Sequence, residues 1–126
     1  MLNVQGTVLR GIFHTEAQGR YLYRTIKPAY YPIPGDGPVR KMLAAMGRHP
    51  YRPAHIHFIV SADGYRSVTT ELSVDGDPYL DSDAVFGVRE SLVFPFVQND
   101  SDEDAARLGV PFSNLDYDFV LEPAEG

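Results

Sequence analysis

The stretch Arg52–Phe58, with the sequence RPAHIHF, decides the fold of this chain. Its histidines alternate with apolar residues, the two-residue period of a half-buried β-strand, and the pattern predicts a strand over His55–Ala62. Asp63-Gly64 follows as a strong hairpin-turn signal and leads into a second predicted strand, Ser67–Val74. A β-hairpin is therefore expected at the centre of the chain.

The same local patterns predict the other elements. The other expected strands are Leu2–Phe13, Arg20–Lys27, Ser91–Val97 and Asp116–Glu122. The expected helical segments are Val39–Met46 (ended by Gly47), Ala84–Glu90 (capped by Asp83) and a single turn at Ala105–Leu108. The expected turns and loops are Thr15–Gly19, Pro28–Pro38, Asp75–Asp83 and Asn99–Asp104. Five or six strands with little helix indicate an all-β fold, a β-sandwich or partly closed barrel with short helical turns. We expect one domain over residues 1–126.

Composition excludes several classes of function. The chain has 126 residues and a formal charge of −6, which argues against a nucleic-acid or membrane-surface partner. It has no cysteine, which excludes disulfides, thiolate metal sites and a thiol nucleophile. No apolar run approaches the length of a membrane span, and no secretion signal is recognisable, so a cytoplasmic location is expected.

The pair His55 and His57 is the candidate metal site. Residues i and i+2 of a strand project from one face about 6.5–7 Å apart, so two imidazoles can converge on one metal ion. The alternative for an isolated His-x-His is a polar sheet face without a metal, but the apolar residues between these histidines make the opposite face core.

Further ligands have to come from other histidines, carboxylates or tyrosines. His14 and His49 lack a supportive context, so a zinc hydrolase with three histidines is disfavoured. Tyr30 and Tyr31 in the proline-rich loop are candidates, because a phenolate oxygen suits a trivalent cation, although an aromatic plug is the alternative for Tyr31.

Two charged residues accompany the histidines. Arg52 could place a permanent cation near the metal, the alternative being a surface ion pair. Glu71 is on the partner strand and could face the same cleft, but an exposed strand carboxylate is the favoured interpretation. A cupin-type site would need a glutamate a few residues after His-x-His, where this chain has none.

Several motifs in fixed order resemble one family. They are Tyr-Pro-x-Pro, Gly-Pro, Gly-Arg-His, Arg-Pro-Ala-His-Ile-His and Gly-Asp-Pro-Tyr, within a match from about Gly11 to Pro123. The chain resembles the catalytic part of the intradiol aromatic-ring dioxygenases, most closely the hydroxyquinol 1,2-dioxygenases and next the catechol 1,2-dioxygenases. The resemblance implies a non-haem Fe(III) cofactor, a small aromatic diol and O₂ as reactants, and a muconate or maleylacetate-type acid as product.

The resemblance also assigns residues. In the family, two tyrosines and two histidines hold the iron, and Tyr31, His55 and His57 stand at three of these positions. Arg52 stands where the family has an arginine that stabilises anionic substrate. Pro32, Ala84 and Val85 stand at positions that line the substrate pocket.

Three departures from the family pattern bear on activity. The family's first tyrosine ligand and its helical dimerisation region lie upstream of the segment that corresponds to Leu2–Phe13, and catechol enzymes carry glutamine where this chain has Glu71. We therefore expect a three-ligand iron site with reduced or absent turnover by this chain alone. The alternative is a vestigial β-sandwich that binds iron or phenolic ligands without turnover; a homo-oligomer is expected in either case from exposed apolar surface.

Overall fold

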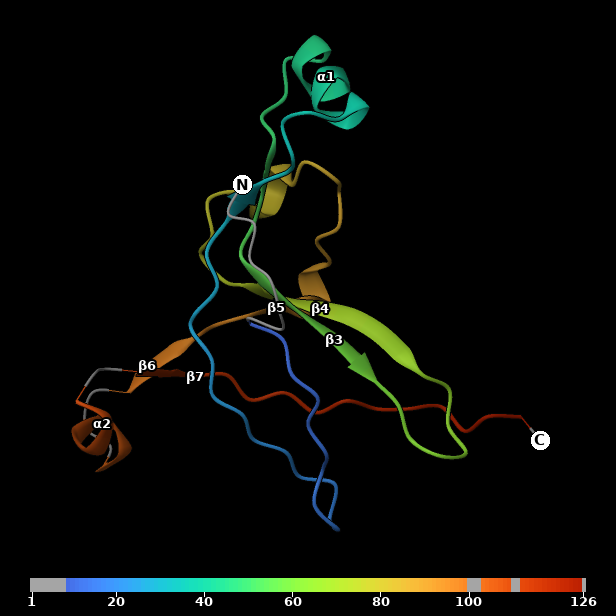
Figure 1. Cartoon of the computed structure of the whole chain (residues 1–126), viewed down its shortest axis with the longest axis vertical. Helices are drawn as coiled ribbons and strands as arrows, with labels where there is room; N and C mark the ends of the chain where they lie inside the picture. Colours follow the sequence, from blue (N-terminus) through green and yellow to red (C-terminus); the bar gives the residue numbers. More distant parts are fainter. Residues whose placement is uncertain (1–8, 100–102, 110–111, 126) are drawn as a thin grey trace.

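The computed structural model describes residues 9–99, 103–109 and 112–125, and its described part is mostly strands and extended segments with few helices (Figure 1). The strands are β1 (Tyr31–Pro32), β2 (Tyr51–Arg52), β3 (His55–Val60), β4 (Val68–Val74), β5 (Val93–Phe94), β6 (Val97–Asn99) and β7 (Phe112–Asn114). The helices are α1 (Pro38–Ala45) and α2 (Glu103–Leu108), with 3₁₀ turns at Leu80–Ser82 and Glu90–Leu92.

The antiparallel β3–β4 hairpin is the centre of the fold, as predicted. His57 pairs with Glu71 and Ile56 pairs with Leu72, so the two histidines and Glu71 share one face while Ile56 and Leu72 share the other. Leu72 is only 1% exposed, which makes the second face the core face. Alternation along one strand thus separates the polar site from the core.

Within the described residues, the hairpin belongs to a three-stranded sheet and is accompanied by two two-stranded sheets, rather than by one continuous sandwich layer. β5 adds to β4 in parallel, β1 pairs with β2, and β6 pairs with β7. The predicted strand Ser91–Val97 is broken into a 3₁₀ turn, β5 and the start of β6, because Pro95 cannot donate to a ladder. No closed barrel is formed within the described ranges, and the two-layer sandwich remains a prediction.

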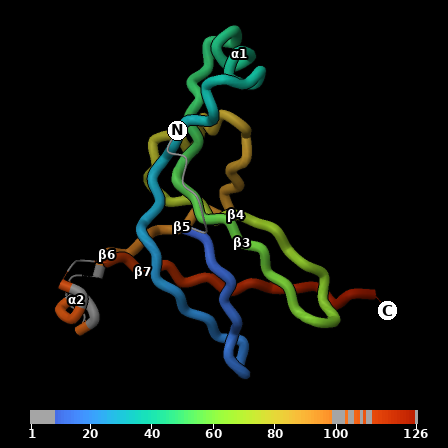
Figure 2. The backbone as a smooth tube through the Cα atoms, in the orientation of Figure 1, coloured from blue at the N-terminus to red at the C-terminus, as the bar shows by residue number. Residues whose placement is uncertain are grey.

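Aromatic contacts, together with one isolated β-bridge between Tyr65 and Pro123, attach the outer segments to the hairpin where no strand ladder does. Phe58 of β3 lies 6.2 Å from Tyr23 and 4.9 Å from Phe119, measured between ring centroids. Tyr23 in turn stacks on Phe13 at 4.9 Å. In Figure 2 the backbones of the blue N-terminal segment and the red C-terminal segment run near β3 and β4, where these ring contacts are made.

These contacts correct three strand predictions. Residues 9–13, 20–27 and 116–122 form no strand. Residues 2–8 of the predicted strand Leu2–Phe13 and residues 100–102 of the predicted acidic loop lie outside the described residues. The Thr15–Gly19 turn is present, with Gly19 at φ +80°, but no ladder follows it. The alternation at Tyr117 and Phe119 serves ring packing instead.

The helix predictions had mixed outcomes. α1 begins one residue before the predicted Val39–Met46 and is followed by Gly47 at φ +67°, and α2 contains the predicted turn at Ala105–Leu108. The prediction of a helix over Ala84–Glu90 is wrong. The segment begins with a turn and continues as extended chain until the 3₁₀ turn that starts at Glu90. Phe86 has a left-handed φ of +56°, which interrupts any helix there.

The buried core is small. Among the described residues, its apolar members are Leu43, Ala54, Leu72, Val74 and Ala84. The chain exposes 10090 Å², whereas a folded 14.0 kDa protein typically exposes about 6,700 Å². Large apolar side chains such as Ile12 and Val120 are therefore left open to contact with other protein.

None of the described helices has the length and apolar character needed to cross a membrane.

Truncating the most buried core side chain is expected to unfold the hairpin readily. Leu72→Ala removes a fully buried isobutyl group and should cost about 2–4 kcal/mol of unfolding free energy, measured by urea denaturation. Ile59→Ala on the neighbouring strand is the control, because Ile59 is 78% exposed and its truncation should cost under about 0.5 kcal/mol. Equal losses in the two variants would contradict the assignment of the core face.

Candidate metal centre

The two histidines converge on one point above the polar face of β3. Their Nε2 atoms lie 3.1 Å apart, and the rings are nearly perpendicular at 87°. Two ligand atoms each about 2.1 Å from one metal ion and about 90–100° apart are separated by roughly 3.0–3.2 Å. The observed separation is therefore the one expected for neighbouring ligands of a single ion.

The backbone fixes the ring of His55. Its Nδ1 lies 2.7 Å from the carbonyl oxygen of Pro53, so Nδ1 carries the proton and Nε2 keeps its lone pair. The side chain is 2% exposed, so the ring has no freedom to turn away. This is the usual way in which a protein prepares a histidine for a metal.

His57 and Glu71 complete a group of possible ligands. Within the described residues, His55, His57 and Glu71 each offer one atom, and these atoms lie within 4.8 Å of one another. The His57 side chain is 63% exposed, which leaves one side of the group open. Burial lowers the pKa of His57, and nearby His55 and Arg52 lower it further against the opposing effect of Glu71, so the neutral, metal-binding imidazole is favoured.

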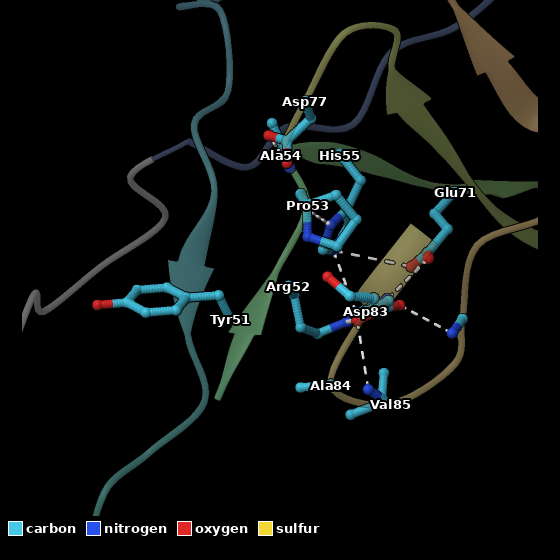
Figure 3. Close-up of polar contacts among 12 residues, drawn as sticks. Tyr51, Arg52, Pro53, Ala54, His55, Glu71, Asp77, Asp83, Ala84 and Val85 are labelled. Carbon is cyan, nitrogen blue, oxygen red and sulfur yellow. Dashed lines mark hydrogen bonds and ion pairs between the residues drawn. The ribbon is translucent and has the colours of Figure 1, made fainter. Parts of the chain in front are cut away.

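Arg52 lies beside the imidazoles and is held by two carboxylates (Figure 3). Its Nε donates to Asp83 Oδ1 at 3.1 Å, and its Nη2 donates to Glu71 Oε1 at 2.8 Å and to Asp83 Oδ2 at 3.2 Å. Its Nη1 lies 3.3 Å from His55 Nε2. Burial alone lowers the pKa of Arg52, but the bonds to Asp83 and Glu71 outweigh it and raise the pKa above its ordinary value. Arg52 is thus a permanent cation at the centre.

Asp83 is the buried anchor of this arrangement. It also accepts the backbone N–H of Val85 at 3.3 Å and that of Gly87 at 2.8 Å. Burial raises the pKa of Asp83, but the bonds from Arg52, Gly87 and Val85 prevail and hold the pKa below its ordinary value. The carboxylate therefore fixes both the arginine and the loop that follows it.

The structure brings Tyr31 to the same side of the site. Tyr31 of β1 pairs with Arg52 of β2, and its ring centroid lies 5.5 Å from that of His55. Tyr30 instead contacts the rings of Tyr51 and Tyr79 at 5.8 and 5.0 Å. Of the two candidate tyrosines, Tyr31 is the one beside the histidines.

The other predicted residues lie around the centre or away from it. Pro32 follows Tyr31 in β1 and pairs with Tyr51. Ala84 is buried, with its N–H donating to the Tyr51 carbonyl at 3.1 Å, and Val85 is half-exposed beside it. His49 is engaged with Ser82 Oγ at 2.8 Å and with the N–H of Tyr51, so it does not join the metal ligands.

Some functional residues were missed or misjudged from the sequence. Glu71 is not an exposed strand carboxylate, since it faces Arg52 and both imidazoles. Asp83 was expected only as a helix cap, and the ion pair it forms with Arg52 is buried rather than superficial. Arg48 was overlooked: it donates to the Asp83 carbonyl at 3.0 Å and stacks on Phe86 with 4.0 Å to the ring centroid. The Gly-Arg-His motif was the available signal for Arg48.

Comparison with known proteins places this chain in a family. A family model described as "Dioxygenase" matches residues 3–123. A hydroxyquinol 1,2-dioxygenase of Rhizobium sp. is 53% identical over 116 residues, and an intradiol ring-cleavage dioxygenase of Aspergillus niger is 46% identical over 114 residues. The chain belongs to the intradiol dioxygenase family.

The family likeness extends to three-dimensional structure but not to full length. The structure matches catechol 1,2-dioxygenase of Acinetobacter sp. ADP1 with a TM-score of 0.78 and 42% identity, over 86% of this chain and 36% of that one. The Rhizobium and Aspergillus matches cover 90% and 89% of this chain but 39% and 34% of those relatives. The chain thus spans less than half the length of these intradiol dioxygenases.

Removing the charge of Asp83 should lower stability in a pH-dependent way. Asp83→Asn is expected to cost about 1–3 kcal/mol near neutral pH, because Arg52 loses its better-buried partner. A group whose pKa is lowered by folding stabilises the fold above its unfolded pKa of about 3.9 and loses that effect as pH falls toward the folded value. The difference between wild type and variant should therefore be constant from pH 7 to about 5 and shrink below about pH 4, in urea denaturation series. A difference that grows on acidification would contradict this role.

Gly87 is expected to tolerate no side chain. A Cβ there would lie 2.6 Å from Arg52 Nη2 and 3.1 Å from Asp83 Oδ2, so Gly87→Ala should displace the ion pair and cost about 1–3 kcal/mol in thermal or urea unfolding. Gly35→Ala is the matched control, because a Cβ at Gly35 meets nothing within 4 Å. Unchanged stability in Gly87→Ala would show that the ion pair can shift freely.

Proposed function

We propose that this chain carries the metal centre of an enzyme that opens an aromatic diol ring between its two hydroxyl-bearing carbons with O₂. The observation that carries the proposal is the convergence of His55 and His57 beside Arg52, in a chain that belongs to the intradiol dioxygenases. Both atoms of O₂ enter the product, the carbon–carbon bond breaks, and each of the two carbons becomes a carboxyl group. The product is a muconate or maleylacetate-type acid.

The residues present fit a non-haem Fe(III) ion. Two imidazole nitrogens at ligand spacing and a neighbouring phenol form a donor set suited to iron, and a phenolate oxygen favours the ferric state. We assign Tyr31, His55 and His57 as the iron ligands. Bound iron would act as a Lewis acid that draws electron density from the chelated diol.

The protein's own groups orient and stabilise the substrate. Arg52 presents Nη1 on the side of the imidazoles, where a guanidinium stabilises the negative charge of a diol that has lost its protons. Asp83 and Glu71 hold that guanidinium in place, so little reorganisation is needed when substrate binds. The exposed side of His57 is the direction from which a diol would approach.

Hydroxyquinol is the favoured diol. The residues proposed to line its pocket are Pro32, Ala84 and Val85. Arg48 supports the last two, because its guanidinium donates to the backbone carbonyl oxygens of Asp83 and Ala84. The Rhizobium relative that is 53% identical bears the name of a hydroxyquinol enzyme. Catechol is the second choice, supported by the likeness to catechol 1,2-dioxygenase.

The alternative function is binding of iron or phenolic compounds without turnover. The observation that favours it is the openness of the centre, since His57 and Tyr31 are both substantially exposed and water is not excluded. A homo-oligomer, a cytoplasmic location and a single β-sandwich domain remain predictions; the exposed apolar side chains support the first of them.

Loading with ferric iron should colour the protein through Tyr31. Wild type is expected to show a broad visible absorption band from phenolate-to-iron charge transfer, which shifts when hydroxyquinol or catechol is added, and ring opening should be followed by the ultraviolet absorbance of the product. Tyr31→Phe should abolish the band, whereas Tyr30→Phe should keep it, because Tyr30 contacts Tyr51 and Tyr79 instead.

The outcomes separate the two functions. A ferric protein without colour would remove Tyr31 from the ligand set. Colour that shifts with the diol but is never followed by ring opening would favour the binding function over the enzyme.

A further inference from the structure

The turn at residues 83–87 has a strained backbone. The Phe86 N–H donates to the Asp83 carbonyl oxygen at 3.1 Å, and Phe86 takes a left-handed φ of +56°. A bulky side chain keeps this conformation only where surrounding contacts offset its cost. Because Gly87 follows Phe86 in the chain, the same conformation directs the Gly87 N–H to Asp83 Oδ2, at 2.8 Å. The strain therefore lies in the turn that orients the Asp83 carboxylate.

Arg48 supplies the contacts that hold this turn. Its Nη2 donates to the Asp83 carbonyl oxygen at 3.0 Å, and its Nη1 lies 3.5 Å from the Ala84 carbonyl oxygen. Its guanidinium carbon lies 4.0 Å from the centroid of the Phe86 ring. A planar guanidinium can donate from its edge and stack with its face at the same time. One side chain thus contacts both the strained residue and the carbonyl groups of the turn.

Arg48 is mounted on a different part of the chain. Its backbone N–H donates at 2.8 Å to the carbonyl oxygen of Leu43, a buried residue of α1. The salt bridges among the described residues do not include Arg48. An ordinary ion pair therefore does not account for this arginine, whose donors go to the backbone of one turn.

The turn also confines Arg52. A Cβ at Gly87 would lie 2.6 Å from Arg52 Nη2, so the backbone of the turn packs directly against that guanidinium. Asp83 accepts from Arg52 Nε at 3.1 Å and from Nη2 at 3.2 Å. A displaced turn would move both the backbone and the carboxylate that hold Arg52.

We propose that Arg48 is a positioning residue, which stabilises the strained 83–87 turn and thereby fixes the Arg52 guanidinium. The consequence for the reaction rests on the proposed function, in which Arg52 stabilises the negative charge of the diol. The fixing of Arg52 is a property of the chain itself, without metal or substrate.

The test follows the Nε–Hε group of Arg52 by ¹⁵N–¹H NMR in the metal-free chain. This proton is bonded to Asp83 Oδ1 and should exchange slowly with solvent. Arg48→Met keeps an unbranched side chain without the guanidinium, and should speed the exchange at least about 10-fold, the order of magnitude that one hydrogen bond contributes. Arg48→Lys keeps the charge without the planar fork, and should behave like Arg48→Met.

Arg66→Met is the matched control. Arg66 is 59% exposed and pairs with Glu122, away from the turn. Its loss removes the same charge from the chain, and the Arg52 proton should exchange as in wild type.

Phe86→Gly tests whether Arg48 offsets strain. Glycine adopts a φ of +56° without steric cost, so the turn should no longer need Arg48. The double variant Arg48→Met, Phe86→Gly should therefore exchange the Arg52 proton as slowly as Phe86→Gly alone does. A general loss of stability would not be reversed in this way, because glycine also increases the freedom of the unfolded chain. Where Arg48→Met alone does not fold, the comparison of these two variants decides.

A second readout uses the chain loaded with ferric iron. Arg48→Met should keep the visible band of wild type, because Arg48 makes no contact with Tyr31, His55 or His57 among its hydrogen bonds and ring contacts. The concentration of hydroxyquinol that gives half of the shift of this band should rise several-fold, because Arg52 is no longer fixed.

Each result decides the inference. Unchanged Arg52 exchange in Arg48→Met, wild-type exchange in Arg48→Lys, or a double variant that exchanges faster than Phe86→Gly would overturn it. Faster exchange with an unchanged hydroxyquinol midpoint would overturn the part of Arg48 in the reaction. A ferric wild type without colour would count against the proposed function alone, since the exchange in the metal-free chain still decides the role of Arg48.

Discussion

The ion pair between Arg52 and Asp83 is the interaction on which the site depends. A guanidinium removed from water is tolerated only with good partners, and Asp83 supplies two hydrogen bonds from the 83–87 loop while Glu71 supplies a third from β4. Arg52 belongs to β2, which pairs with the strand carrying Tyr31. One buried cation therefore ties together three parts of the chain that are distant in sequence.

The register between β3 and β4 decides which side chains share the face of the histidines, and this register could not be predicted from the sequence alone. A two-residue loop at Asp63-Gly64 would pair His57 with Thr70 and would put Glu71 opposite Ile56, on the core face. The observed pairing of Val60 with Val68 leaves a longer loop and puts Glu71 opposite His57. The existence of both strands followed from local alternation, whereas the position of Glu71 depended on a one-residue difference in the loop.

Elements set by neighbouring residues were predicted well, and elements set by distant contacts were not. The β3–β4 hairpin, α1 and the turns at Gly19 and Gly64 follow from short-range periodicity and glycine conformation. Residues 116–122 alternate like a strand but pack through aromatic rings. Asp83 accepts the backbone N–H of Val85, as a helix cap would, yet Phe86 takes a left-handed φ of +56° and no helix follows; the carboxylate instead holds Arg52. That distant partner has no signature in the local sequence.

The candidate metal centre is rigid and buried on the side of His55 and open to solvent on the side of His57. The rigid side bears on the stability of the site, and the open side bears on its chemistry. His55 is 2% exposed and locked by the Pro53 carbonyl, whereas His57, one strand period further, is 63% exposed. Rigid ligands lower the cost of organising a metal site, and an open coordination side is needed for a substrate to reach the ion. The same opening admits water, which would weaken the electrostatic help that the proposed function asks Arg52 to give to an anionic diol. On the proposed function, the rigid side formed by β2, β3 and β4 would govern metal binding, and the covering of the open side at His57 and Tyr31 would govern the rate of ring opening.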